Sequence, residues 1–179
     1  GYDVDNSCRF NDDDGAYMYF NPSSSGNPDK WTFSCWIKRG TVNLGRADQI
    51  YHLYVDGNNH QKLYFETDDQ LHCNLEIGGS KKNRQITTAK YRDPAAWMHI
   101  VIIYDSGNAT SGNRQRMFIN NEELTAFGED TMADQNQDSL FVDGNDLYIG
   151  TDGRDYADSY FNGYMAEVVF CDGQALTPK

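Results

Sequence analysis

The chain has no long hydrophobic run and little positive charge. Its longest unbroken apolar stretch spans 100–104, far short of the ~20 residues that a membrane-spanning helix needs. Lys and Arg number 15 against 27 Asp and Glu, which gives a formal net charge of −12. Nucleic acids are bound through clustered Lys and Arg. The composition therefore argues against membrane insertion and against nucleic acid as a partner.

The chain also lacks several features of its ends and interior. It does not begin with Met, and no basic start is followed by the apolar stretch of a secretory signal peptide. No internal repeat or linker divides it, and 179 residues are enough for one core but few for two. We expect residues 1–179 to form a single domain that belongs to a longer protein.

The four cysteines show neither CxxC nor Cys/His zinc spacing, and the four histidines are dispersed. In the expected strands Cys8, Cys35 and Cys73 alternate in step with large apolar residues, so we expect them to be small buried hydrophobes. Cys171 is out of step with its apolar neighbours and should face the other way. We expect four reduced thiols, which fits assembly in a cytoplasm.

The sequence consists mainly of short apolar runs separated by Gly, Ser, Thr and Asn. Aromatic residues make up 13 % of the chain, and Gly numbers 16. This pattern is typical of short strands joined by turns, and no segment is convincing as a helix. The expected strands are 7–10, 16–20, 30–38, 49–55, 61–66, 71–77, 84–88, 97–104, 115–120, 122–127, 146–150 and 163–171. They predict an all-β sandwich or barrel.

The segment 97–124 is the most informative part of this pattern. It contains a β-branched strand, a loop, and a second strand that ends in Asn120-Asn121, a pair that tolerates the positive φ of a two-residue hairpin turn. Both faces of 97–104 are apolar, so this strand should be central and covered on both sides. The loops 128–139 and 151–160 are the expected cover, with a ligand or a neighbouring subunit as alternatives. The expected core contains Phe33, Ile37, Val101, Ile103, Ile119, Val168 and Phe170.

Several phrases occur in an order that resembles one superfamily. They are WTFSCWIK (31–38), WMHIVIIYD (97–105), MFINNEEL (117–124), LYIG (147–150) and FNGYMAEVVFCDGQALT (161–177). Together they are similar to the laminin G/pentraxin-like branch of the concanavalin A-like lectin/glucanase superfamily. The opening SCRFNDDDGAY (7–17) and the ending VFCDGQALTP (169–178) resemble such domains in tail-fibre and other virion proteins of marine bacteriophages.

This resemblance implies an antiparallel two-sheet jelly roll in which the first and last strands are adjacent and Cys8 lies near Cys171. It also implies a lectin-like module on a phage tail fibre or virion surface. Its partners would be a cell-surface glycan and other virion subunits, with which it could form an oligomer. The alternative is a structural or oligomerising virion domain that binds no sugar.

Glucanases of this superfamily carry a Glu-x-Asp-x-Glu strand, whose period of two places three carboxylates on one face. The nearest match here is Glu66-Thr67-Asp68-Asp69-Gln70, in which Gln replaces the third acid and Asp68-Asp69 is typical of a turn. Without that proton donor the leaving group receives no acid. We expect no catalysis, with a glycoside hydrolase relative as the less favoured alternative.

The segment 143–160 combines aromatic, carboxylate and guanidinium side chains in an expected loop, which suits sugar binding. The candidate sugar-binding residues are Asp152, Arg154, Asp155, Tyr156 and Tyr160. Trp36 is an alternative platform, although structural cover explains it as well. The oxygen-rich sequence also suits Ca²⁺, with Asp143, Asp146 and Asp158 as candidate ligands. A solvated turn has the same composition, so both interpretations stay open.

Overall fold

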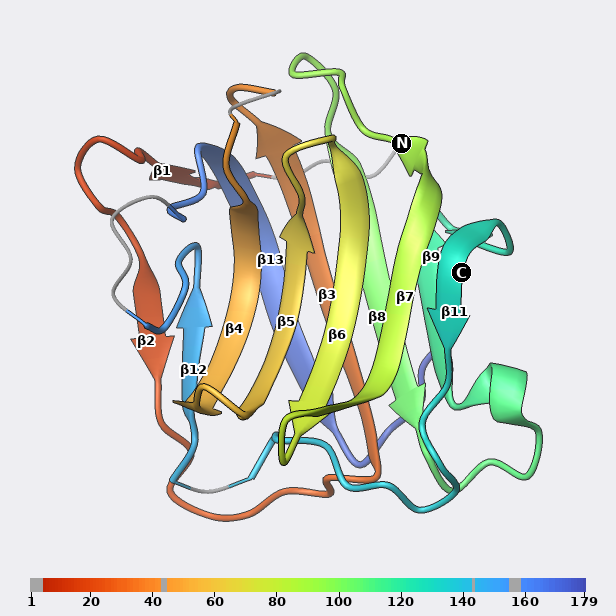
Figure 1. Cartoon of the computed structure of the whole chain (residues 1–179). Helices are drawn as coiled ribbons and strands as arrows, with labels where there is room; N and C mark the ends of the chain where they lie inside the picture. Colours follow the sequence, from red (N-terminus) through yellow and green to blue (C-terminus); the bar gives the residue numbers. More distant parts are fainter. Residues whose placement is uncertain (1–4, 43–44, 143, 155–158) are drawn as a thin grey trace.

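Two antiparallel β-sheets pack face to face (Figure 1). This computed structural model describes residues 5–42, 45–142, 144–154 and 159–179. The strands are β1 (Cys8–Phe10), β2 (Met18–Phe20), β3 (Lys30–Arg39), β4 (Asp48–Asp56), β5 (Asn59–Phe65), β6 (Gln70–Ile77), β7 (Ser80–Lys90), β8 (Met98–Asp105), β9 (Gln115–Ile119), β10 (Glu122–Glu123), β11 (Phe127–Thr131), β12 (Asp146–Ile149) and β13 (Gly163–Asp172). The helical element among the described residues is a short 3₁₀ turn, η1 (Ser111–Asn113).

The strand order is β1-β13-β3-β8-β9-β10 in the six-stranded sheet and β11-β7-β6-β5-β4-β12-β2 in the seven-stranded sheet. The predicted all-β jelly-roll sandwich is therefore confirmed, including the adjacent first and last strands. The predicted turn is confirmed as well, because Asn120 and Asn121 have φ of 52° and 70° between β9 and β10. No helix in the described part of the chain is long and apolar enough to cross a membrane.

The main core lies between the sheets and is rich in aromatic rings. Phe33 and Ile37 are buried there as predicted, and Ile119, Val168 and Phe170 pack against it while partly exposed. Val101 and Ile103 do not belong to this core. With Phe118 they form a second buried cluster, because β8 alternates and its Ile100 and Ile102 take the inward positions.

The C-terminal segment, rather than the expected loops, crosses the face that holds this second cluster. Thr32 of β3 donates to the backbone oxygen of Gln174, and Leu176 N–H donates back to the Thr32 hydroxyl. Asn121, beyond β9, donates to the backbone oxygen of Lys179. Because β8 lies between β3 and β9, a segment anchored at both strands passes over it. The prediction that 128–139 and 151–160 cover this face was therefore wrong for the described residues, and 155–158 lie outside them.

A β-bulge in β13 changes which side chains face the core. The register with β3 shifts between Ala166 and Val169, and Glu167 has a φ of 48°. Tyr164, which simple alternation places inward, is 39 % exposed, whereas Met165 is buried. Beyond the bulge Val168 and Phe170 turn toward the core as predicted, because the extra residue reverses the phase of the strand.

The four cysteines are free, but their burial differs from the prediction in one case. Cys35 and Cys73 are buried as expected and Cys171 is half-buried, whereas Cys8 is exposed. Cys8 shares a side with Phe10, yet a hollow of ≈ 280 Å³ next to Met18 and Met165 leaves that part of the edge open. Cys8 pairs with Met165, six residues before Cys171 on β13. At about 3.3 Å per residue the two thiols are therefore far apart, and their implied proximity was wrong.

This burial predicts graded thiol reactivity. In the native protein Cys8 should react rapidly with a thiol reagent and Cys171 more slowly, while Cys35 and Cys73 should be protected. Burial raises the pKa of Cys73 to about 12 and also raises the pKa of Cys35, which suppresses the reactive thiolate. Titration in denaturant should find four thiols, and Cys8→Ser should remove the fast phase. Fewer than four thiols without reductant would contradict this prediction.

Candidate functional site

The outer face of the seven-stranded sheet carries a row of aromatic and ionisable side chains. Tyr148 of β12 pairs with Tyr19 of β2 on one side and with His52 of β4 on the other. His52 pairs in turn with Lys62 of β5. Because Leu147 and Ile149 point into the core, alternation along β12 directs Tyr148 outward. These four side chains therefore lie side by side across four strands.

Three tyrosines surround a hollow at the end of this row, which we call the tyrosine pocket. Tyr17, Tyr148 and Tyr160 line it together with the backbone turn 151–153, and its volume is ≈ 280 Å³. The ring centroids of Tyr17 and Tyr148 are 6.2 Å apart, and those of Tyr19 and Tyr148 are 5.5 Å apart. Tyr17 and Tyr19 are 52 % and 55 % exposed. The result is an aromatic surface open to a ligand.

Glycine at position 153 allows the turn to approach these rings. A Cβ there would lie 2.7 Å from the Tyr148 ring and 2.9 Å from the Tyr54 Cβ. The Gly153 N–H donates to Nδ1 of His52 at 2.9 Å, which fixes the turn against β4. Tyr160 is held from another side, since Arg46 donates to its backbone oxygen. The walls of the tyrosine pocket are thus positioned by packing and by hydrogen bonds.

A buried carboxylate organises the charges beside the tyrosine pocket. Asp152 is 1 % exposed, and Arg154 donates through Nε to Oδ1 at 2.9 Å and through a terminal nitrogen to Oδ2 at 2.7 Å. The Lys62 ammonium lies 3.5 Å from Oδ2. Burial raises the pKa of Asp152, but the hydrogen bonds from Arg154 and the positive charge of Lys62 outweigh it and hold that pKa well below the usual range.

This arrangement assigns different chemistry to Asp152 and Arg154. The oxygens of Asp152 are already engaged, so the carboxylate orients its neighbours instead of meeting a ligand directly. The Arg154 side chain remains 34 % exposed, and a guanidinium can donate to hydroxyl or carboxylate oxygens. A flat aromatic surface beside such donors is suited to a sugar ring, which offers an apolar face and a rim of hydroxyls.

The structure brings together only part of the predicted sugar site. Asp152 and Tyr160 line the tyrosine pocket together, and Arg154 contacts Asp152, as the contiguous sequence suggested. Asp155 and Tyr156 lie outside the described residues. Trp36 belongs to β3 in the other sheet, where its ring stacks on His99 at 4.9 Å. Trp36 is therefore not part of the tyrosine pocket.

Sequence reasoning missed the residues that come from other strands. Tyr17, Tyr19 and Tyr148 form most of the aromatic surface, and His52 and Lys62 supply the polar neighbours. The alternation of Tyr17 and Tyr19 with Met18 and Phe20 was a usable signal for one aromatic face. Nothing local to the sequence indicated that β2 lies beside β12.

The predicted calcium ligands are placed only in part. Asp143 and Asp158 lie outside the described residues. Asp146 accepts hydrogen bonds from the Tyr19 hydroxyl at 2.9 Å and from the Asn21 amide at 2.6 Å. Within the described ranges no group of three or more His, Cys, Asp or Glu side chains could hold a metal ion. Calcium binding stays a prediction.

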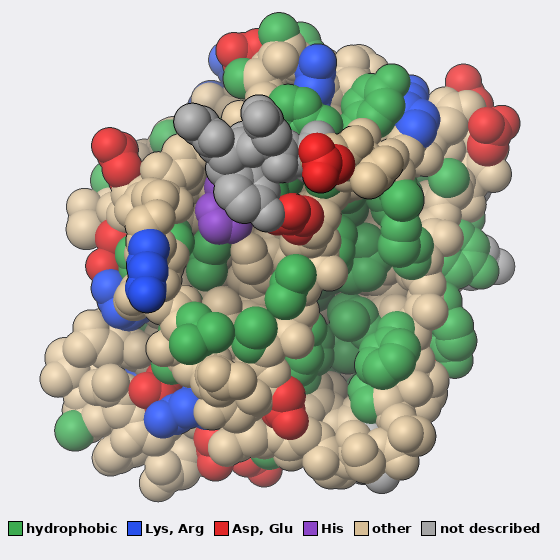
Figure 2. Space-filling view, turned by 180° about the vertical axis from the view of Figure 1, so that it is seen from behind, with side chains coloured by type: hydrophobic (Ala, Val, Ile, Leu, Met, Phe, Trp, Pro, Cys, Tyr) green, Lys and Arg blue, Asp and Glu red, His purple; other side chains and the backbone are tan. Residues whose placement is uncertain are grey.

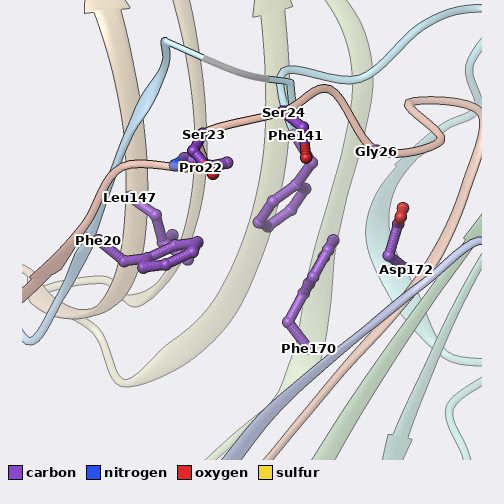
Figure 3. A pocket seen from close by; sticks show the side chains of 9 residues that line it. All are labelled: Phe20, Pro22, Ser23, Ser24, Gly26, Phe141, Leu147, Phe170 and Asp172. Carbon is purple, nitrogen blue, oxygen red and sulfur yellow. The ribbon is translucent and has the colours of Figure 1, made fainter.

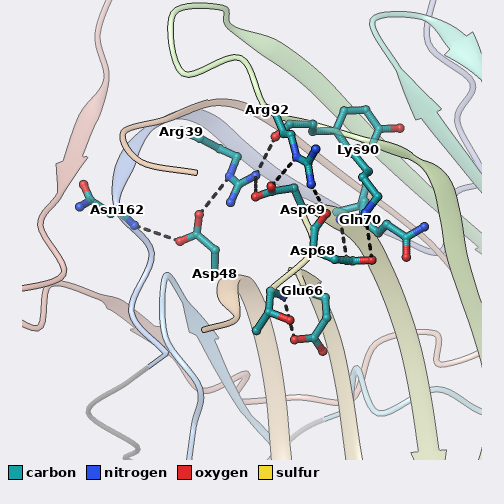
Figure 4. Close-up of polar contacts among 12 residues, drawn as sticks. Arg39, Asp48, Glu66, Asp68, Asp69, Gln70, Lys90, Arg92 and Asn162 are labelled. Carbon is teal, nitrogen blue, oxygen red and sulfur yellow. Dashed lines mark hydrogen bonds and ion pairs between the residues drawn. The ribbon is translucent and has the colours of Figure 1, made fainter. Parts of the chain in front are cut away.

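The Glu66–Gln70 segment is a turn, as expected, and does not form a carboxylate strand. Gln70 accepts the backbone hydrogen bond of Glu66, and Asp69 has a φ of 68°. Asp69 is buried, and its carboxylate forms ion pairs with Arg39 and Arg92 (Figure 4). This acid supports the fold at the end of the sandwich, far along the sheet from β2.

Comparison with protein-family models decides the family. A model described as "Concanavalin A-like lectin/glucanases superfamily", of the laminin G type, matches residues 12–179. The chain belongs to this superfamily. No curated protein sequence is similar enough to this lectin/glucanase-superfamily domain to count as a match.

Solved structures share the fold of this lectin/glucanase-superfamily domain at low sequence identity. Domain 4 of a Geobacillus stearothermophilus arabinanase, in complex with arabinotriose, is 14 % identical with a TM-score of 0.60, over 96 % of this chain and 84 % of that one. The CBM40 domain of a Ruminococcus gnavus sialidase, bound to α2,3-sialyllactose, is 14 % identical with a TM-score of 0.56, over 86 % and 93 %. Mouse laminin α1 domains LG4-5 are 14 % identical with a TM-score of 0.62. The similarity covers 98 % of this chain but 46 % of that fragment.

Proposed function

We propose that this domain is a non-catalytic glycan-binding module and that the tyrosine pocket, with Arg154 beside it, is the sugar site. The observation that carries the proposal is the convergence of Tyr17, Tyr148 and Tyr160 around one hollow of ≈ 280 Å³. Aromatic rings stack on the apolar faces of sugars, and the neighbouring donors satisfy hydroxyls. Two similar folds were solved with oligosaccharides, which supports this class of ligand.

We further propose that the domain belongs to a phage tail fibre or another virion surface protein. The resemblance of segments 7–17 and 169–178 to such proteins supports this context. One site should bind sugar weakly, at about −4 to −6 kcal/mol. Several copies on one particle would raise the effective concentration and give useful adhesion. A multimer displayed on beads should therefore be retained on host-surface glycan far better than the monomer.

Replacing Tyr17 and Tyr160 together by Ala should weaken glycan retention at least about tenfold, because the aromatic walls are lost. The melting temperature should change little, since Tyr17 is more than half exposed. The measurement is binding of the multimer to a glycan array, with calcium and with chelator. Tyr164→Ala is the matched control, because this exposed tyrosine lies on β13 in the other sheet.

Two outcomes would contradict the proposed site. Retention that survives the double substitution would place the sugar elsewhere, and Trp36→Ala would then test the opposite sheet. Failure of every glycan to be retained, with or without calcium, would favour the structural alternative.

One observation favours that alternative, a structural or oligomerising virion domain. The edge strand β2 and the residue before it expose four consecutive large hydrophobic side chains, Tyr17, Met18, Tyr19 and Phe20, between 41 % and 59 %. Exposed edge strands and apolar patches are common sites of association. Sedimentation analysis distinguishes the two roles, since an oligomer dissociated by Tyr19→Lys would identify this edge as an interface.

A further inference from the structure

Another hollow, distinct from the tyrosine pocket and from the hollow beside Cys8, opens between the two sheets at the edge that ends in β2. We call it the edge pocket. Phe20 and Leu147 line one end, Asp172 lies at the other, Phe141 and Phe170 stand between them, and the loop 22–26 borders it (Figure 3). Its volume is ≈ 250 Å³. Seen from behind, hydrophobic side chains gather around a recess on the right of the molecule (Figure 2).

The back wall of the edge pocket is rigid. The Phe141 and Phe170 rings are stacked with centroids 4.2 Å apart, and Trp31 packs against both at 4.7 and 5.8 Å. The indole N–H of Trp31 donates to the Ser139 hydroxyl at 2.9 Å, which fixes the ring. Because the fold already holds these rings in place, a ligand that binds here would have to order few side chains.

The front wall is incompletely covered. Phe20 pairs with Leu147, yet Leu147 is 8 % exposed and Phe20 is 59 % exposed. The loop beyond Phe20 is pinned at both ends, since Asn21 donates to Asp146 and the Asn27 N–H donates to Asp172. The edge pocket therefore stays open beside the exposed Phe20 ring, which another apolar group could cover.

The polarity of the edge pocket indicates the charge of its ligand. Among the described residues that line it, Asp172 is the charged one. Its carboxylate is exposed, and within the described part of the chain the Asn27 N–H donates to its Oδ1 at 2.7 Å. A second oxygen can therefore accept from a ligand. Aromatic faces also attract cations, so the Asp172 carboxylate and the aromatic rings both favour a positively charged ligand.

We propose that the edge pocket binds a small organic cation, with an aryl or branched alkyl body between Phe20 and the Phe141–Phe170 pair and an ammonium group at Asp172. A cavity of about 150 Å³ accepts benzene, so the larger edge pocket has room for a phenyl ring with a short amine-bearing chain. The net charge of −12 adds long-range attraction for cations. This site and its ligand are independent of the proposed glycan site.

The test uses three probes of one shape: 3-phenylpropylamine, 3-phenylpropanol and 3-phenylpropionate. Saturation-transfer NMR and calorimetry on the full chain should give saturable binding in the order amine, alcohol, carboxylate. Asp172→Asn should weaken amine binding about tenfold and leave alcohol binding unchanged. Phe20→Ala should weaken the amine and the alcohol alike, whereas Tyr17→Ala, in the tyrosine pocket, should affect neither.

The proposal is overturned if none of the probes binds saturably at millimolar concentration, if the alcohol binds as tightly as the amine, or if amine binding survives both Asp172→Asn and Phe20→Ala. Phe20 and Asp172 are exposed, so both variants should fold. Ser24→Phe, which fills the hollow from an exposed loop, gives a second test if Phe20→Ala does not fold. It should abolish binding of all probes without changing glycan retention.

Discussion

Replacing Arg39 by Met should lower the free energy of unfolding by about 3–5 kcal/mol. Arg39 is buried and lies between two buried carboxylates, with Nε 3.2 Å from Asp48 Oδ2 and a terminal nitrogen 3.0 Å from Asp69 Oδ1 (Figure 4). It also donates to the backbone oxygen of Tyr91 at 2.7 Å. Met keeps most of the apolar stem but leaves both acids without their shared cation.

Arg92→Met is the matched control for this prediction. Arg92 contacts the same Asp69 at 2.9 Å, but its side chain is 55 % exposed. Its loss should cost no more than about 1 kcal/mol, because exposed ion pairs contribute little. Denaturant unfolding of both variants provides the comparison. Equal losses for Arg39→Met and Arg92→Met would show that burial does not set the strength of this network.

The strands were predictable because their determinants are local. Alternation in 30–38 and 71–77 placed Cys35 and Cys73 in the core, and the structure buries both. Asn120 and Asn121 predicted their turn because few other residue pairs tolerate positive φ. The Glu66–Gln70 turn followed from its own composition. Each of these features depends on neighbours a few residues away.

The errors in the fold have non-local causes. The bulge at Glu167 is opposed by β3, more than a hundred residues away, and it reverses the phase of β13. The burial of Cys8 depended on whether Met18 closes the edge, which it does not. Val101 and Ile103 are covered by the C-terminal segment, whose course is set by contacts with Thr32 and Asn121. Periodicity carries no information on such partners.

The candidate site likewise combines residues that are close in sequence, which could be predicted, with residues joined by strand pairing, which could not. Asp152, Arg154 and Tyr160 are close in sequence, so the placement of Asp152 and Tyr160 in one pocket, with Arg154 on Asp152, could be anticipated. Tyr17 and Tyr148 meet because β2 and β12 are paired, and His52 joins them because β12 also pairs with β4. A strand order is a global property of the sheet, and local patterns in one sequence do not reveal it. The aromatic surface was therefore found only in the structure.

The second large effect concerns acid. His52 is fully buried on β4, and its Nδ1 accepts the Gly153 N–H, so the neutral ring carries its proton on Nε2. Burial lowers the pKa of His52 to about 4, although Asp152, 3.1 Å from Nδ1, opposes the shift. Lys62 and His60 on the neighbouring strand add to it. Protonation of Nδ1 would break the bond that holds the turn at Gly153.

The sign follows from proton binding. In the unfolded chain the His52 ring binds a proton as the pH falls below its ordinary pKa of about 6.5. In the folded protein the ring stays neutral until the pH approaches 4. Stability from the neutral ring is therefore fully present above pH 6.5 and is lost as pH falls toward 4, by about 3 kcal/mol. Asp48 acts in the opposite direction, because burial raises its pKa to about 6 against the Arg39 charge. The net profile of the wild type accordingly combines both groups.

Comparison with His52→Asn isolates the histidine. Asn can accept the Gly153 N–H but cannot titrate, so Asp48 and the remaining histidines stay common to both proteins. The unfolding free energy of the wild type, relative to that of the variant, should fall by about 3 kcal/mol from pH 7 to pH 4. Denaturant unfolding at half-unit pH intervals measures it, with His99→Asn on the opposite sheet as the control. A difference that is constant across this range would mean that His52 is protonated in the folded protein as easily as in the unfolded chain.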